Sequence, residues 1–410
     1  MAEPYVRLLH DDEMEAGARL VATAMLGSLR DDVMSGWTAM MPSENSHGAF
    51  TADGRLVGLA RWFADEVAVP GGDSLGAAGV TAVAVLPTHR RQGHLRRLMG
   101  AQLDQIAAAG VPVALLVAAE WPIYGRFGYG PAMDACAYEV DATAARFRDA
   151  PSGDVELVTP AELLPHLEAA HAARWARSPG SLRRETSTWE RAIGLISRPG
   201  DTSDLGLRRG ALWRDDEGVM RGALSYTVTD DWVRNRPSAT AEALLLVGET
   251  PEAERELWRH LCDLDWVTTV KGPLRAVDDP LPLFLSDGRA AAQVDRSDAI
   301  WARLLDVPAA FTARRSSVPG AAVIEVEDHL GYGAGRWAIE VGPDAGSAAL
   351  TDRRADVRMS IAALGSLYFG GHTARRLADA GWIHELEEGA VDRVSAVLAT
   401  PAAPWSTTSF

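Results

Sequence analysis

The sequence predicts a mixed α/β fold divided into three units. The chain has 410 residues, more than one hydrophobic core normally serves. Strand-like apolar runs alternate with helical segments, and the run 83–99 reads as a buried strand, a basic loop and a helix start. A glycine turn and apolar strand at residues 54–63 return at residues 218–228. We therefore expect three units, at residues 1–142, 143–295 and 296–410.

The composition and net charge indicate which kinds of partner are expected. Hydrophobic residues make up 47% of the chain, as in globular proteins, and the formal net charge is −16. Nucleic acids and anionic membranes attract basic faces, so neither is an expected partner, whereas cationic substrates are compatible with this charge. Cys136 and Cys262 are the only cysteines, which predicts no disulfide framework and a cytoplasmic location. Neither a secretory pattern nor a membrane-spanning apolar stretch of about 18 residues is found.

The first unit is expected to form a mixed sheet with helices. The pattern predicts a helix at residues 13–29, a strand pair at 49–63, strands at 79–86 and 111–118, and a helix at 93–109. Glycine and proline loops separate the strands.

The basic loop before the second of these helices is the first candidate site. A helix N-terminus with free backbone N–H groups attracts anions, and Arg90, Arg91 and Arg96 add positive charge. A side chain at Gly93 would hold the backbone away from a phosphate. The loop has neither the glycine spacing of a dinucleotide fold nor a Gly-Lys-Ser/Thr ending. We predict that it binds a pyrophosphate; the alternative is an ordinary basic helix start at the surface.

The second unit repeats the pattern of the first without its basic loop. Residues 218–228 repeat the glycine turn, and Leu244–Leu257 stand where the phosphate loop would be. There, carboxylates replace the arginines and no glycine precedes the helix. Like charges repel, so this unit is not expected to bind a pyrophosphate. The alternative is a chance similarity between two α/β units.

The third unit begins with the amphipathic run Ile300–Phe311. Alternation predicts strands at residues 321–326 and 336–341, and the apolar run 361–371 leads into a helix at 373–380. The last twelve residues contain prolines, which favour an extended tail, and its Trp405 and Phe410 are aromatic anchors.

Short motifs in all three units resemble those of one known family. They are Pro87–Arg91, Ile123–Pro131, Asp279–Pro282, Val307–Ala310, Leu364–Tyr368 and the terminal Phe410. Residues 90–95, Arg-Arg-Gln-Gly-His-Leu, are similar to the Arg/Gln-x-x-Gly-x-Gly/Ala motif for the coenzyme A pyrophosphate, with Leu95 in place of the small residue. With these motifs the chain resembles the Eis ("enhanced intracellular survival") family of GNAT N-acetyltransferases. The resemblance implies tandem GNAT domains, the second degenerate, followed by a sterol-carrier-protein-like C-terminal domain.

The resemblance also implies the reaction and its components. The donor would be acetyl-coenzyme A, without a metal, and the acceptors would be amines of aminoglycosides, polyamine-like molecules or lysine side chains. A homohexamer would be the assembly. The cofactor would contact Val83, Ala84, Val85, Arg90, Arg91, Gln92, Gly93, His94, Leu95, Arg96, Ala119 and Glu120. The acceptor would lie near Trp37, Met25 and Ser409, although aromatic and acidic residues are found at comparable places in aminoglycoside-modifying members, and Trp37 could equally be a core residue.

Two groups are expected to handle protons. An acceptor amine with a pKa near 10.4 is mostly charged at neutral pH, so a base must remove its proton. The resemblance assigns this role to the terminal carboxylate of Phe410, whose pKa of about 3.5 in water would rise on desolvation. Tyr124 would be the acid, because a phenol with a pKa of about 10 stays protonated and can supply a proton to the departing sulfur. Tyr129 is the alternative acid, and simple packing is the alternative role for Tyr124.

Stabilisation of the oxyanion is expected from backbone N–H groups of Val83–Val85, provided that a bulge or divergence of strands frees them. A different class of function is a non-catalytic acyl-coenzyme A or lipid carrier, in which apolar runs of the third unit would line a tunnel. A metal or triad hydrolase is not predicted, because His-x-x-x-His and G-x-S-x-G patterns are lacking.

Overall fold

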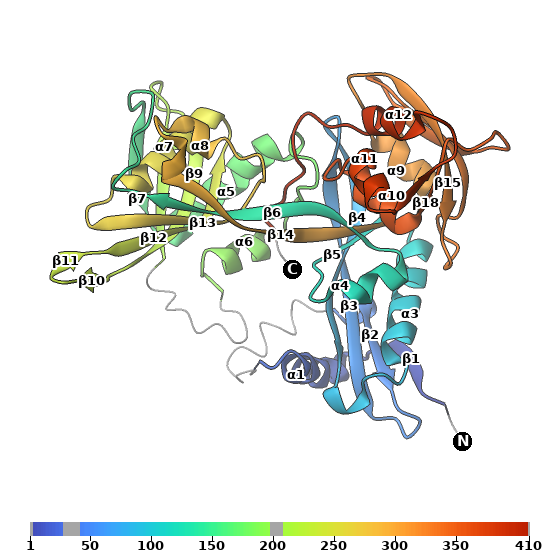
Figure 1. Ribbon diagram of the computed structural model, residues 1–410. Coiled ribbons are helices and arrows are strands. Elements are labelled where there is room, and N and C mark those ends of the chain that lie inside the picture. The colour runs from blue at the N-terminus through green and yellow to red at the C-terminus, as the bar shows by residue number, and fades with distance from the viewer. Residues whose placement is uncertain (1–2, 28–41, 197–207, 409–410) are drawn as a thin grey trace.

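The computed structural model describes residues 3–27, 42–196 and 208–408. Figure 1 shows a unit of sheet and helices at lower right, a second at left, and a third, smaller unit above the first. Long strands run from the first unit into the second, so the two share one sheet.

The first unit has the expected alternation of strands and helices. Its elements are β1 (Tyr5–Leu8), α1 (Met14–Ala24), β2 (Ser46–Phe50), β3 (Leu56–Val69), β4 (Asp73–Val85), α3 (His94–Ala108), β5 (Val113–Leu116), α4 (Trp121–Tyr124) and β6 (Gly130–Asp141).

Helix α1 ends earlier than the sequence predicts, at Ala24 instead of residue 29. Leu26 has a left-handed backbone with φ of 61°, and the N–H of Gly27 donates to the carbonyl of Ala22 at 2.8 Å. This is the Schellman arrangement that closes helices, and it usually uses glycine at the left-handed position. Because Leu26 takes that position here, the amphipathic pattern concealed the end of the helix.

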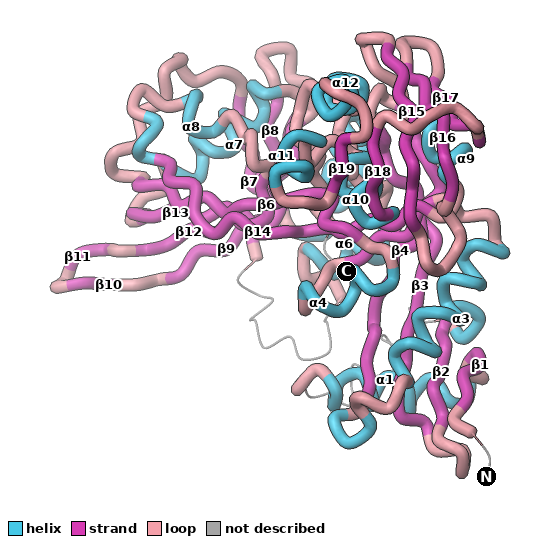
Figure 2. Tube along the Cα trace, turned by 45° about the vertical axis from the view of Figure 1, so that its right-hand side comes forward, coloured by secondary structure: helices cyan, strands magenta, loops and turns pink. Residues whose placement is uncertain are grey.

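The second unit follows the same order of elements. They are β7 (Asp154–Val158), α5 (Pro160–Trp175), α6 (Thr186–Ala192), β8 (Arg209–Arg214), β9 (Met220–Thr229), β10 (Trp232–Val233), β11 (Arg236–Pro237), β12 (Ala239–Gly248), α7 (Pro251–Cys262), β13 (Val267–Arg275), α8 (Leu281–Phe284) and β14 (Ala291–Leu304). Strands β10 and β11 form an arm that projects from the sheet (Figure 2). Cys136 on β6 and Cys262 on α7 are free and buried.

The third unit packs helices against a five-stranded sheet of order β17-β16-β15-β18-β19. Its elements are α9 (Val307–Ala313), β15 (Gly320–Glu327), β16 (Gly335–Val341), β17 (Gly346–Leu350), β18 (Val357–Ser360), α10 (Ile361–Tyr368), α11 (Ala374–Asp379), β19 (Ile383–Glu385) and α12 (Ala390–Val397).

The amphipathic run 300–311 is divided between two elements. Residues 301–304 pair with β5, from Trp301 opposite Leu116 to Leu304 opposite Val113. Asp306 then starts α9, because its carboxylate accepts the N–H of Ala309 at 2.9 Å. Strand β14 therefore runs across the expected boundary between residues 295 and 296.

The first two units exchange strands. Among the described residues the large sheet has the order β1-β2-β3-β4-β5-β14-β6-β13-β12-β9-β8-β7. Strand β14, the last of the second unit, lies between β5 and β6, and β6 lies between β14 and β13. Each strand of this sheet has a counterpart in the other unit. When every strand is replaced by its counterpart, the sheet read from β7 to β1 has the same order as the sheet read from β1 to β7. Neither unit can complete its sheet alone.

The third unit packs closely against one face of the sheet in the first unit. Apolar side chains of β3, β4 and β5 share a core with α9, α10 and the small sheet. Helix α10 lies so close to the large sheet that a Cβ at Gly130 would clash with the carbonyl of Ala362, and one at Gly365 with the carbonyl of Ala302. Glycines on both sides set the separation of these elements.

We expect residues 1–142 to remain unfolded when expressed alone, because β5 and β6 would each lose their contact with β14 and expose hydrogen-bonding edges. Circular dichroism and proteolysis of the fragment test this. As a control, a protease site is inserted at residues 149–152 of the full chain, between β6 and β7. Cleavage there should not unfold the protein, because every strand of the sheet, β14 included, is still present. A stable, cooperatively unfolding fragment would contradict the importance of the exchange.

Candidate active site

The central feature of the first unit is a slot between β4 and β5. The two strands pair in parallel from Ala77 opposite Val113 to Val80 opposite Leu116. Beyond that point β4 continues to Val85, and its last residues have no partner on β5 among the described residues. Backbone N–H and C=O groups on this side of β4 are therefore available to a ligand.

A bulge in β4 lies where the strands separate. Leu59 of β3 is opposite Ala84, but Arg61 is opposite Thr81, so β4 contains one additional residue. Ala82 has a φ of 53°, which is uncommon for a residue with a side chain. Bulges re-aim backbone groups, and this one lies directly before Val83–Val85, the residues expected to bind the oxyanion.

The loop after β4 ends in a left-handed turn at the start of α3. Gly93 is the N-cap of this helix with φ of 83°, and Arg91 has φ of 64°. Arg90 holds the loop in place, with its guanidinium 3.3 Å from the carbonyl of Ala24 and 3.4 Å from that of Val85. The free N–H groups at the helix start remain at the exposed end of the loop.

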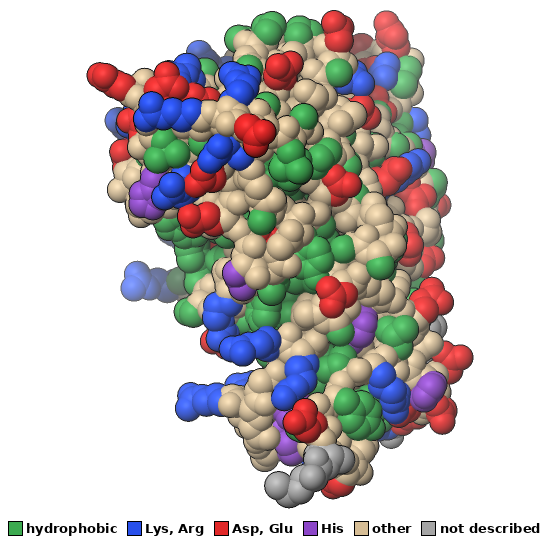
Figure 3. Space-filling model, turned by 90° about the vertical axis from the view of Figure 1, so that its right-hand side faces the viewer, with side chains coloured by type: hydrophobic (Ala, Val, Ile, Leu, Met, Phe, Trp, Pro, Cys, Tyr) green, Lys and Arg blue, Asp and Glu red, His purple; other side chains and the backbone are tan. Residues whose placement is uncertain are grey.

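The positively charged side chains of this loop are accessible to an anion. Arg91, Gln92 and Arg96 are exposed, and within the described parts of the chain Arg91 and Arg96 make no hydrogen bond or ion pair. In Figure 3, Lys and Arg side chains project from the lower half of the molecule, which the first unit forms, beside a hollow with hydrophobic side chains. Helix N-terminus, backbone and arginines together fit a pyrophosphate.

The side chains of His94 and Leu95 have a structural place. His94 is 2% exposed, and burial lowers the pKa of its imidazole, so it is neutral at pH 7. Leu95 is half-buried against the cluster that contains Met99 and Leu116. Both residues can offer a ligand only their backbone N–H groups, and Leu95 fits because its side chain points away from the loop.

Tyr124 ends the short helix α4, close to the end of the slot. Its side chain is 7% exposed and meets Tyr129 edge to face, with 6.4 Å between ring centroids. Burial, with a smaller contribution from the charge of Glu120, raises the pKa of the Tyr124 phenol above its usual value near 10. The phenol therefore stays protonated throughout the neutral range. Ala119 and Glu120, directly before α4, are exposed.

Tyr129, the alternative acid, lies deeper. It is fully buried, and its hydroxyl has no hydrogen-bond partner in the described part of the protein. A group so enclosed is poorly placed to exchange protons with a ligand.

The turn after Tyr124 is anchored by a buried ion pair that the sequence did not indicate. Arg303 of β14 donates to the carbonyl of Phe127 at 2.5 Å and to Asp328 of the third unit at 2.8 Å. Both charged side chains are fully buried. Burial alone would raise the pKa of Asp328, but hydrogen bonds from Gly333 and Leu330 and the charge of Arg303 lower it below its usual value. No local pattern could reveal this contact, because its partners are far apart in sequence.

The expected acceptor residues are only partly described. Trp37, Ser409 and Phe410 lie outside the described residues. Met25 is the C-cap of α1 and is 57% exposed. The contact between Arg90 and Ala24 brings this end of α1 against the phosphate loop.

Comparisons with known proteins give matches to all three units. Two family profiles described as "Acetyltransferase (GNAT) domain" match residues 5–132 and 180–295, and one described as "Sterol carrier protein domain" matches residues 307–407. N-acetyltransferase Eis of Mycobacterium bovis is 32% identical over 409 residues, or 95% of each chain. The chain belongs to the Eis family of GNAT N-acetyltransferases.

Other relatives are similar over the full length. An uncharacterized N-acetyltransferase of Streptomyces griseus is 35% identical over 410 residues and 98% of each chain. The crystal structure of Eis1 from Mycobacterium abscessus superimposes with a TM-score of 0.86 at 32% identity, over 99% of this chain and 100% of that one. A GCN5-related N-acetyltransferase from Anabaena variabilis, with a TM-score of 0.85 and 20% identity over 100% of both chains, shares the fold. The protein is thus an acyltransferase, and acetyl-coenzyme A is the donor that GNAT acetyltransferases use.

The second GNAT unit of this Eis-family chain keeps the scaffold and differs at the residues expected to act in the first unit. Strands β12 and β13 separate after Glu242 opposite Lys271, and β12 has a register shift between Ala243 and Leu245, as β4 has. However, the N-cap of α7 is Thr250, and Glu252 and Glu254 lie in the first turn of this helix. In α8 the sequence Leu-Pro-Leu-Phe stands where α4 has Trp-Pro-Ile-Tyr, so Phe284 replaces Tyr124.

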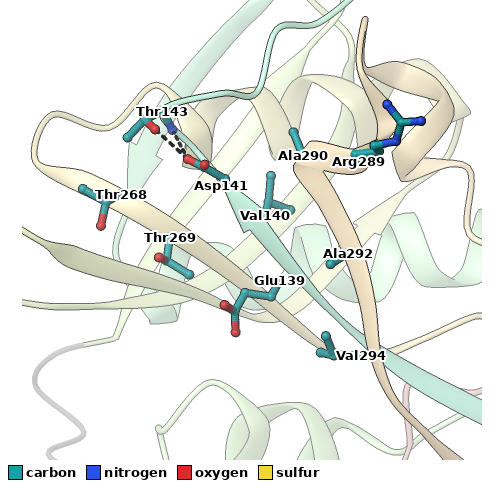
Figure 4. A pocket seen from close by; sticks show the side chains of 10 residues that line it. All are labelled: Glu139, Val140, Asp141, Thr143, Thr268, Thr269, Arg289, Ala290, Ala292 and Val294. Atoms are coloured by element: carbon teal, nitrogen blue, oxygen red, sulfur yellow. Dashed lines mark hydrogen bonds between the residues drawn. The ribbon is translucent and has the colours of Figure 1, made fainter.

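A cavity of about 480 Å³ on the second unit is not the counterpart of the slot. It lies over β6, β13 and β14, and Figure 4 shows Glu139, Asp141, Thr268 and Thr269 on these strands, with Arg289 at the side. In the first unit the corresponding face of the sheet is covered by the third unit. The cavity therefore lies on the face of the sheet that corresponds to the face covered by the third unit in the first unit.

In the described ranges, no group of three or more His, Cys, Asp or Glu side chains is arranged to hold a metal ion. No helix in these ranges has the length and apolar character needed to cross a bilayer.

We expect Gly93→Ala to weaken binding of coenzyme A by about 5- to 30-fold, because a left-handed backbone costs a residue with a side chain about 1–2 kcal/mol. Calorimetric titration measures the effect. Gly100→Ala on the same helix is the control, since a Cβ there meets nothing within 4 Å. Equal affinity of both variants would mean that the left-handed turn does not form the phosphate site.

Proposed function

We propose that the first unit binds acetyl-coenzyme A between β4 and β5 and transfers its acetyl group to an amine. The observation that carries this proposal is the combination of the β4 bulge at Ala82 with the separation of the strands after Val80. It makes backbone donors available between an anion-binding helix start and a protonated phenol. The bound donor supplies an activated thioester.

The phosphate end of the donor would lie at the start of α3. Backbone N–H groups of Gly93, His94 and Leu95 point out of the helix end, and Arg91, Gln92 and Arg96 are exposed beside them. Arg90 would act mainly by holding the loop against α1 and β4.

The reacting end would lie beside Val83–Val85. The acceptor nitrogen attacks the thioester carbonyl carbon, a C–N bond forms, and the C–S bond breaks. A backbone N–H of β4 stabilises the oxyanion, an interaction worth about 3–4 kcal/mol per donor in acyl transfer. Tyr124 donates its phenolic proton to the departing sulfur, and Ala119 and Glu120 form the wall beside the acetyl group.

The amine must lose its proton to attack, and we assign this step to the terminal carboxylate of Phe410, directly or through water. The support comes from the tail that leads to it. Ser406 and Thr408 are each 7% exposed, so the tail is packed into the protein up to the last described residue. A desolvated carboxylate is a better base than one in water.

The acceptor is proposed to be a cationic amine, such as an aminoglycoside, a polyamine or a lysine side chain, next to Trp37, Met25 and Ser409. The net charge of −16 favours cationic over anionic acceptors. Two further parts of the proposal are a homohexameric assembly, which the family resemblance implies, and a cytoplasmic location, which the two cysteines favour.

A carrier function for the third unit receives no support from its interior. Phe311, Tyr368 and Phe369 are fully buried there and meet edge to face, with centroids 5.6 and 4.9 Å apart. The Tyr368 hydroxyl donates to the carbonyl of Ala310 at 2.6 Å. Aromatic side chains thus fill the centre of the unit, where a carrier would need a tunnel.

We expect Tyr124→Phe to lower kcat by about 10²- to 10⁴-fold without changing the Kd for acetyl-coenzyme A, because only proton donation is lost. Thiol release and calorimetry measure the two quantities. Tyr129→Phe is the matched control, since it removes a buried hydroxyl that lacks a partner among the described residues. If Tyr129→Phe were the slower variant, the acid would be Tyr129.

Converting the C-terminal carboxylate of Phe410 to a carboxamide should lower kcat by about 10²-fold or more and leave donor affinity intact. This change removes the base and adds almost no volume. The control carries an acetylated N-terminus and an unmodified C-terminus. Full turnover of the carboxamide would exclude the terminal carboxylate as the base.

A further inference from the structure

In the second unit, the C-terminal tail occupies the space between β12 and β13 beyond the point where these strands separate. We call this space the second slot. Residues Ala243–Leu246 of β12 follow its last pair with β13, Glu242 opposite Lys271, as Thr81–Ala84 of β4 follow its last pair with β5, Val80 opposite Leu116. Residues Ala243–Leu246, with Pro273–Arg275 of β13, line a pocket whose remaining walls are Trp405 and Thr407 of the C-terminal tail. The tail therefore lies where the first unit would bind the acetyl end of its donor.

Trp405 is held in the slot by specific contacts. Its indole N–H donates to the carbonyl of Leu274 at 2.8 Å, and its backbone N–H donates to the carbonyl of Pro179 at 2.9 Å. The guanidinium carbons of Arg275 and Arg174 lie 5.1 and 5.6 Å from the centroid of the ring. The side chain is 7% exposed. Two hydrogen bonds to backbone carbonyls and two cation–π contacts therefore fix Trp405.

A buried charge network keeps Arg275 in position. Its guanidinium pairs with Asp279 at 2.6 Å and with Glu254 at 3.1 Å, and it donates to the carbonyl of Leu246 at 3.1 Å. Arg174 pairs with the same Glu254. Glu254 belongs to the first turn of α7, where the first unit has its phosphate loop. At this position the carboxylate of Glu254 would repel a phosphate. It instead pairs with Arg174 and Arg275, the two arginines that contact Trp405.

Contacts on both sides of Trp405 define the path of the tail. Before it, the N–H of Ala403 donates to Asp278 at 2.8 Å, and Pro404 packs against Gly371 and Gly180, neither of which has room for a side chain. After it, Thr407 accepts a hydrogen bond from Arg184 at 3.1 Å.

The segment around Arg184 belongs to the interface with the first unit. The backbone N–H of Arg183 donates to the carbonyl of Glu66 in β3 at 2.9 Å, and Leu182 forms a bridge with Val67. Strand β3 is the neighbour of β4, which forms the slot of the first unit. The described tail thus leaves the second slot toward the sheet that carries the candidate active site.

We propose that the degenerate cofactor slot of the second unit is a binding site for the C-terminal segment of the same chain, with Trp405 as its anchor. Trp405 is a positioning residue: it fixes the point from which the last five residues extend. That the segment delivers a catalytic carboxylate rests on the function proposed above, whereas the clamp itself rests on contacts of described residues. The same occupancy leaves one slot per chain for acetyl-coenzyme A.

The test compares Trp405→Ala with Trp382→Ala, which removes an indole partly buried in the third unit. Hydrogen exchange followed by mass spectrometry reports on residues 403–408. We expect Trp405→Ala to accelerate exchange there by about tenfold or more, with the control unchanged in this segment. We also expect kcat to fall by about tenfold, with an unchanged Kd for acetyl-coenzyme A. Trp405→Phe, which keeps the ring and loses the N–H, should be intermediate, and it carries the test if Trp405→Ala fails to fold.

The outcomes separate the clamp from the catalytic proposal. Unchanged exchange at residues 403–408 in Trp405→Ala would overturn the clamp, whatever the activity. Faster exchange with full turnover would keep the clamp and remove the role of the terminal carboxylate. If both proposals hold, Trp405→Ala combined with deletion of residues 409–410 should be no slower than the deletion alone. A multiplicative loss in the double variant would mean that Trp405 acts on the reaction by another route.

Discussion

The position of β14 is the constraint on which the rest of the structure depends. This strand belongs by sequence to the second unit, yet it lies between β5 and β6 of the first. Its residue Arg303 holds the turn after Tyr124 and forms the buried ion pair with Asp328. Its end leads directly into α9, the first helix of the third unit. One strand therefore connects the sheet of both GNAT units, the candidate acid and the C-terminal domain.

Local patterns predicted the parts of the site that are local. The basic loop with Gly93 at a helix start and the aromatic turn around Tyr124 each lie in one short run of sequence. The packed Trp405 was indicated by its place in a proline-containing tail. In contrast, the end of α1 at Leu26 uses a residue with a side chain in a position typical of glycine. The role of Arg303 depends on partners brought together only by the tertiary fold.

The two GNAT units show which features of a duplicated fold persist. The bulge and the separation of strands are properties of backbone pairing, and both units have them. The expected anion site and the candidate acid depend on which residues are present, and there Thr250 and Phe284 stand in the second unit where Gly93 and Tyr124 stand in the first. A slot without its ligand would leave apolar side chains in contact with water, which is unfavourable unless another segment covers them. In this chain the C-terminal tail covers them.

The close packing at Gly130 and Gly365 has a consequence for evolution. Because no side chain fits between α10 and the sheet, the surfaces of the first and third units can change only in compensating pairs. The buried Arg303–Asp328 pair adds the same restriction through charge, since either ion alone inside the protein is strongly unfavourable. A C-terminal module transplanted from a distant homologue would therefore bring a mismatched surface and an uncompensated buried charge, so we expect exchange of this module alone to destabilise the protein.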